Sequence, residues 1–151
     1  MTYVVLKFVH VLAVVAWIGG ATALATVTGR LIGARDRTTL AALFPHSMAY
    51  GQRVAGPSAI VVLLTGIALV IIGKLSWSAF WISWGFAGII VHFVFGAMIM
   101  RKRGMAFAKV VSAPGNDAEI AAAGARLRIA NLIYLLIMVS VIGAMVLKPT
   151  L

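Results

Sequence analysis

The chain has 151 residues, of which 63% are hydrophobic and 11% are charged, and 13 Lys and Arg against three acids give a formal net charge of +10. So little polar surface cannot cover a water-soluble globule, and the length leaves room for one domain. The absence of cysteine excludes disulfides, thiolate metal sites and covalently attached haem. The bases lie between apolar runs, so we interpret them as signals that face anionic lipid, with no nucleic acid as partner.

Charged residues divide the sequence into four uncharged apolar runs, at residues 8–29, 54–73, 75–100 and 129–147. Each run is close to the ~20 residues that a helix needs to cross the hydrocarbon core. Lipid offers no hydrogen bonds to exposed backbone, and continuous apolarity without alternation favours helices over barrel strands. We therefore predict an all-α integral membrane protein: one four-helix transmembrane bundle over residues 1–151, with helices at about 3–31, 46–73, 76–103 and 118–147.

Basic residues concentrate in two connections, with four Lys or Arg in residues 30–53 and six in residues 101–128. Because Lys and Arg favour the cytoplasmic side, we expect both connections inside and both termini outside. Pro45 is expected in the first turn of the second helix, and Pro114–Gly115–Asn116 is expected to end the third. The helices should then extend beyond the membrane on the cytoplasmic side.

The apolar runs contain no acidic residue, so the usual parts of a proton relay or a carboxylate dyad are missing. The serines in these runs have no base at a suitable spacing, and neither a nucleophile elbow nor a zinc-binding helix motif occurs. We assign no catalytic residue. Histidines are the remaining candidates for chemistry inside the membrane.

His92 lies deep in the third run, with Gly85 and Gly88 before it and Gly96 after it on the same helical face. Glycines at this spacing make a groove that either a flat macrocycle or another helix can approach. A neutral imidazole in lipid costs free energy unless its nitrogens are satisfied, and coordination to iron is one way to satisfy them. Ligand binding and helix packing both remain open for this pattern.

His10 lies about two turns into the first helix and shares its face with Lys7, Val14 and Trp17. A hydrogen bond from this histidine to a neighbouring helix is the alternative to ligand binding. At ~1.5 Å per residue, His10 and His92 differ in depth by roughly 8 Å, which helix tilt would have to absorb if both bound one iron.

Polar residues near the inner membrane surface offer further contacts. Asn131 and Tyr134, one turn apart on the last helix, predict hydrogen bonds between helices, with a cofactor carboxylate as the alternative. Arg53, Arg126 and Arg128 either set topology or meet an anionic group.

Four short motifs together resemble a known group. They are Leu6–His10, Ala16–Gly20, Leu64–Gly66 and Met145–Pro149. The chain resembles a family of predicted bacterial integral membrane proteins of unassigned function, distantly similar to CopD-type copper-resistance proteins and HemJ-type protoporphyrinogen oxidases.

The resemblance implies a compact four-helix bundle in the bacterial inner membrane, paired into a homodimer. It also implies b-type haem at a histidine near the start of the first helix, which corresponds to His10 here. HemJ-type enzymes rely in addition on a lysine farther along the chain. The third run has none between Lys74 and Lys102 and carries His92 instead, so the oxidase activity does not carry over.

The leading hypothesis is a membrane protein that binds haem b and transfers electrons to or from a quinone or another redox partner. His10 and His92 would be axial ligands to the iron, and the other cofactor contacts would come from Trp17, Arg53, Gly85, Gly88 and Gly96. The alternatives are a HemJ-like oxidase of a tetrapyrrole or other small molecule, a copper-related binding or transport protein without haem, and a bundle whose histidines only pack.

Overall fold

The computed structural model describes residues 1–113 and 117–149, and the described chain is helical apart from short connections. Four long helices occur in these residues, at Thr2–Gly33, Arg37–Ile72, Phe80–Ser112 and Asp117–Leu147. Each is long enough and apolar enough to cross a membrane. The prediction of an all-α protein with four membrane-spanning helices is confirmed.

A π-helical turn interrupts each of the first three long helices. The elements in chain order are α1 (Thr2–Val14), η1 (Val15–Gly19), α2 (Gly20–Gly33), α3 (Arg37–Tyr50), η2 (Gly51–Ala55), α4 (Gly56–Ile72), α5 (Phe80–Val94), η3 (Phe95–Met100), α6 (Arg101–Ser112) and α7 (Asp117–Leu147). A π turn widens the helix and rotates the faces that follow it, and such turns are frequent at functional sites. The turns η1 and η2 contact each other inside the bundle.

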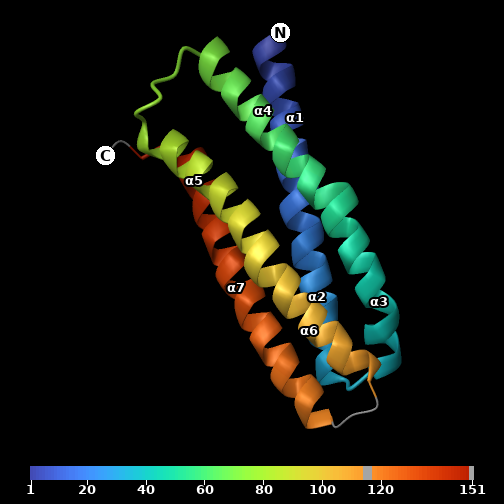
Figure 1. Ribbon diagram of the computed structural model, residues 1–151. Coiled ribbons are helices and arrows are strands. Elements are labelled where there is room, and N and C mark those ends of the chain that lie inside the picture. Colours follow the sequence, from blue (N-terminus) through green and yellow to red (C-terminus); the bar gives the residue numbers. More distant parts are fainter. Residues whose placement is uncertain (114–116, 150–151) are drawn as a thin grey trace.

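The helices form two pairs that converge at one end of the bundle. α1 lies along α4, and α5 lies along α7; these pairs diverge toward the chain termini (Figure 1). At the opposite end, α2, α3, α6 and the first half of α7 pack together. We call this part, which carries residues 30–53, 101–113 and 117–128, the basic half, and the part with both termini the terminal half. That the basic half faces the cytoplasm stays a prediction.

Two buried apolar clusters hold the bundle together. The first lies in the middle, where all four long helices meet, and consists of Ala13, Trp17, Ala55, Ala59, Val62, Ile89 and Met138. The second lies in the basic half and consists of Leu40, Phe107, Val111, Ile120 and Leu127. Many other large apolar side chains face outward, as lipid contact requires, including Leu64, Ile90 and Leu136.

The second helix begins nine residues before the expected position, at Arg37. Asp36 caps it, because its carboxylate accepts a hydrogen bond from the Thr39 amide at 3.0 Å. Pro45 therefore lies inside α3 and not in its first turn, which corrects the expectation. The third helix begins at Phe80 and continues to Ser112, beyond the expected residue 103. The expected helix break at residues 114–116 lies outside the described residues.

Candidate functional site in the centre of the bundle

Trp17, His92 and Tyr134 form a polar cluster at the centre of the membrane-spanning region. They come from η1, α5 and α7. Trp17 Nε1 donates a hydrogen bond to the Tyr134 hydroxyl at 3.0 Å, and that hydroxyl lies 2.6 Å from His92 Nδ1. The indole and imidazole rings are also in edge contact, with centroids 4.3 Å apart. Three helices are thus joined at one hydroxyl group, as predicted for Tyr134.

The hydrogen positions in this cluster have two solutions. An indole nitrogen only donates, so the Tyr134 oxygen must accept from Trp17. The hydroxyl hydrogen then either goes to His92 Nδ1, or Nδ1–H donates to a second lone pair of the same oxygen. The first solution leaves His92 Nε2 protonated, and the second leaves it with a free lone pair.

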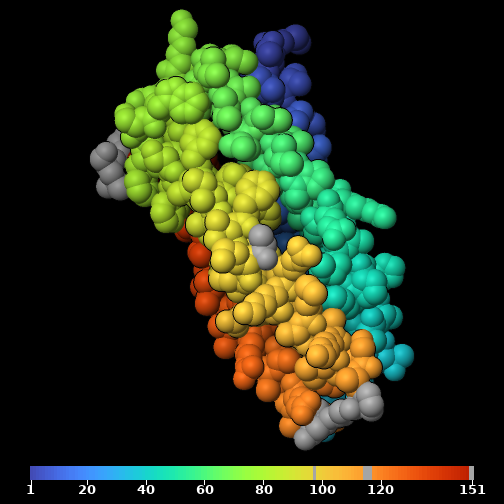
Figure 2. All heavy atoms as spheres, in the orientation of Figure 1, coloured from blue at the N-terminus to red at the C-terminus, as the bar shows by residue number. Residues whose placement is uncertain are grey.

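A cavity of ≈ 520 Å³ lies beside this cluster, between all four long helices. The space-filling view looks onto the face where the α3–α4 and α5–α6 helices lie side by side, with blue atoms of the first helix visible between them (Figure 2). The walls include Trp17, His92, Gly96, Arg101 and Tyr134.

The Nε2 nitrogen of His92 belongs to a residue that lines this cavity. It makes no hydrogen bond to any described residue, and no fully buried side-chain nitrogen or oxygen among those residues lacks a partner. The nitrogen is therefore not fully buried. The site thus has one imidazole nitrogen without a hydrogen-bond partner among the described residues, on a residue of the cavity wall.

Tyr50, which the sequence analysis did not single out, supports the Trp17 backbone. Its hydroxyl donates toward the carbonyl oxygens of Ala16 and Trp17, 2.6 Å from each. These carbonyls belong to the π turn of the first helix, where regular helical hydrogen bonding is disturbed. The Tyr50 ring packs directly on Gly20, whose missing side chain makes room for it. No local signal in the sequence pairs Tyr50 with these two residues.

His10 lies in a separate polar contact in the terminal half. Its Nδ1 is 2.9 Å from the Thr65 hydroxyl, and that hydroxyl donates to the Val61 carbonyl at 2.6 Å. Because threonine has one hydroxyl hydrogen, the His10 ring must be the donor in the first contact. A neutral His10 therefore carries its proton on Nδ1 and keeps a lone pair on Nε2. Gly66 lies beneath the same ring.

The structure does not bring His10 and His92 together. His92 touches Trp17, which follows His10 by seven residues on the same helix, or roughly 10 Å along its axis. Two metal–imidazole bonds of about 2 Å each span much less than this. The central apolar cluster, with Ala13 and Trp17, lies between the two levels. The two histidines therefore cannot bind the same metal ion, and each could bind one only in a separate site.

The remaining predicted cofactor contacts divide between packing and the cavity. A side chain at Gly85 would collide with Met145, and one at Gly88 would meet Val141 at 2.7 Å, so both glycines serve packing against α7. Only Gly96 of the three lines the cavity. Arg53 is exposed and does not line it. Arg101, which does line it, was not predicted.

Among the described residues, no three His, Cys, Asp or Glu side chains gather into a metal-binding group. A metal at this site would need a ligand sphere completed by a macrocycle or by thioethers. Met48 and Met100 both line the cavity and offer such sulfur atoms.

The fold and the site together define an integral membrane four-helix bundle with a polar cluster and a cavity at its centre. A family model matches residues 4–149, nearly the whole chain. The chain belongs to this family, DUF2269, which is described as predicted integral membrane protein. No curated protein and no solved structure matches the chain.

Proposed function

We propose that the protein binds one b-type haem in the central cavity, with His92 as an iron ligand, and transfers electrons within the membrane. The observation that carries this proposal is that His92, whose Nε2 makes no hydrogen bond to a described residue, lines a cavity of ≈ 520 Å³. Ligand sites typically have volumes of about 300–1,000 Å³. Without cysteine, such a haem would be held by coordination and packing alone.

The cavity walls suit a flat, mostly apolar ring with charged edges. Several lining positions carry no side chain, which widens the cavity; these are Gly51, Gly56, Gly96 and Gly104. Leu24 and Phe44 provide apolar surface. Arg101 and Gln52 line the cavity and offer donors to the two propionate groups, and guanidinium pairs well with carboxylate.

A haem held by one histidine would accept a second protein ligand. Met48 and Met100 line the same cavity, and their thioethers would be available to hold the iron together with His92. A haem bound to His10 would occupy a second, separate site. The resemblance to HemJ-type enzymes implies haem at this residue, whereas the cavity favours His92. Variants of the two histidines therefore test different versions of the haem hypothesis.

A second candidate follows from the other hydrogen arrangement in the cluster. The separation of 2.6 Å between Tyr134 and His92 Nδ1 is short for an N–H donor and ordinary for an O–H donor. With Tyr134 as donor, Nε2–H points into the cavity as a hydrogen-bond donor and cannot bind iron. That arrangement suits a planar carbonyl ligand, such as the quinone predicted as a redox partner.

The visible spectrum of the purified protein, oxidised and then reduced, tests the haem proposal. Protein expressed with ample haem should show a Soret band and sharp reduced bands. His92→Ala should abolish them, and His10→Ala should not. His46→Ala changes an exposed histidine and is the control for haem loss caused by mutation and purification alone. A colourless wild type, or loss of haem in His10→Ala with retention in His92→Ala, overturns the proposal.

Further measurements separate the finer alternatives. Carbon monoxide should leave a six-coordinate haem spectrum unchanged, whereas an altered spectrum supports an open position and a HemJ-like oxidase. Copper in place of haem on metal analysis supports the copper-related alternative. The homodimer and the bacterial inner membrane remain proposals, to be tested by mass measurement in detergent and by membrane fractionation.

A further inference from the structure

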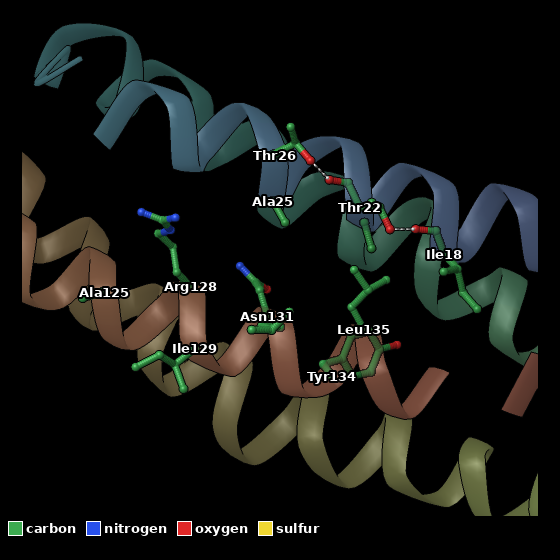
Figure 3. A pocket seen from close by; sticks show the side chains of 12 residues that line it. Ile18, Thr22, Ala25, Thr26, Ala125, Arg128, Ile129, Asn131, Tyr134 and Leu135 are labelled. Atoms are coloured by element: carbon green, nitrogen blue, oxygen red, sulfur yellow. Dashed lines mark hydrogen bonds between the residues drawn. The ribbon is translucent and has the colours of Figure 1, made fainter. Parts of the chain in front are cut away.

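A second hollow lies between α2 and α7 and opens to the outside of the bundle. It has a volume of ≈ 460 Å³, and its lining includes Thr22, Thr26, Arg128, Asn131, Leu132 and Leu135. Figure 3 shows Arg128 and Asn131 reaching from α7 into the space that faces α2. We call it the α2–α7 groove. It is apolar toward the terminal half and polar at its basic end.

Two side chains provide the free hydrogen-bond donors of the groove. The hydroxyls of Thr22 and Thr26 donate hydrogen bonds to backbone carbonyls of their own helix, both at 2.8 Å (Figure 3). Arg128 and Asn131 make no side-chain hydrogen bond or ion pair with any described residue. A guanidinium and an amide are thus left to hold a ligand with several acceptor oxygens.

The electrostatics of the groove favour an anion. The two acids nearest to Arg128 along α7 are Glu119 and Asp117, nine and eleven residues before it, or roughly 13 and 16 Å along the helix axis. α2, the opposite wall, has no acidic residue and carries Arg30. No carboxylate on either wall neutralises Arg128.

The position of Arg128 selects a lipid over a small anion. It is the last charged residue before the apolar run 129–147, so it lies at the level of the lipid headgroups. The groove continues from there into the hydrocarbon along Leu132, Leu135 and Ile18. We propose that the α2–α7 groove binds an anionic phospholipid, with its phosphate at Arg128 and Asn131 and an acyl chain along the apolar part. Guanidinium binds phosphate in a bidentate manner.

Native mass spectrometry of the protein released from bilayers of equal phosphatidylglycerol and phosphatidylcholine tests the proposal. The wild type should retain phosphatidylglycerol in preference to phosphatidylcholine. Arg128→Gln should lower this retention about fivefold, the effect expected for one base at a membrane surface. Arg126→Gln removes the same charge from an exposed residue of α7 outside the groove and should change retention little.

A steric variant tests the groove without changing charge. Leu132→Trp should fill the groove and displace the lipid, whereas Leu136→Trp changes an equally exposed residue of α7 that does not line it. Equal losses in the two arginine variants, equal losses in the two tryptophan variants, or no preference for phosphatidylglycerol in the wild type would each overturn the proposal. Haem content should be the same in all four variants, so this result is independent of the function proposed above.

Discussion

Tyr134→Phe removes the hydroxyl that joins three helices while keeping the ring. The variant leaves Trp17 Nε1–H without an acceptor in a residue that is 3% exposed. An unsatisfied buried donor costs about 1–3 kcal/mol. The lost contact with His92 adds about 0.6 kcal/mol, the average for hydrogen bonds between membrane helices. We expect the free energy of unfolding to fall by roughly 2–4 kcal/mol.

Unfolding by sodium dodecyl sulfate in mixed micelles, followed by circular dichroism, measures this change. Trp17→Phe removes the donor, so Tyr134→Phe should cost less in that background. The coupling free energy between the two changes should be about 1 kcal/mol, within the range for residues in direct contact. Tyr3→Phe is the matched control, because Tyr3 is half-buried and makes no hydrogen bond to a described residue.

Two results would refute the cluster as described. One is a Tyr134→Phe protein as stable as the Tyr3→Phe control, which should lie within about 0.5 kcal/mol of the wild type. The other is strict additivity of the Trp17 and Tyr134 changes. Either result would mean that the two residues do not share a hydrogen bond in the membrane.

Two further predictions concern a close ring contact and a helix cap. Gly20→Ala should destabilise the protein by about 1–3 kcal/mol in the same unfolding assay, because a methyl group there collides with the Tyr50 ring. Gly19→Ala is the control, since Gly19 has open space beside it, and should change the free energy of unfolding by less than about 0.5 kcal/mol. Equal effects of the two substitutions would contradict this contact. Hydrogen bonds from Thr39 lower the pKa of Asp36, so the cap stabilises α3 above the ordinary aspartate pKa of about 4 and is lost as the pH falls below it. Hydrogen exchange at the start of α3 should speed up at low pH in the wild type, after correction for intrinsic rates, but not in Asp36→Ala; identical pH profiles would contradict the cap.

The membrane fold could be predicted because it depends on composition along the chain. Charges at Lys7, Arg30, Arg53, Lys74 and similar positions bound apolar runs of membrane length, and lipid permits few alternatives to helices. The ends of the helices were harder to predict from the sequence. Asp36 and Thr39 extend the second helix past Pro45 by a local cap that the pattern of apolar residues does not reveal.

The candidate site could be predicted only in part from the sequence, for a different reason. His92 and Trp17 stand out as polar groups in apolar runs, and Tyr134 as a donor between helices. Their meeting at one hydroxyl depends on which helix faces oppose each other, which the spacing of residues along a single helix does not reveal. For the same reason, Gly85 and Gly88 face α7 while Gly96 faces the cavity.

Chemical rescue of a ligand deletion tests the haem proposal most directly. In His92→Gly, the side chain that would bind iron is replaced by space beside the cavity, and free imidazole can enter it. We predict that this variant lacks the Soret band after purification and regains it when haem and imidazole are added together, but not with haem alone. A His92→Gly protein that holds haem as the wild type does, or a wild type that takes up none, would contradict iron coordination by this residue.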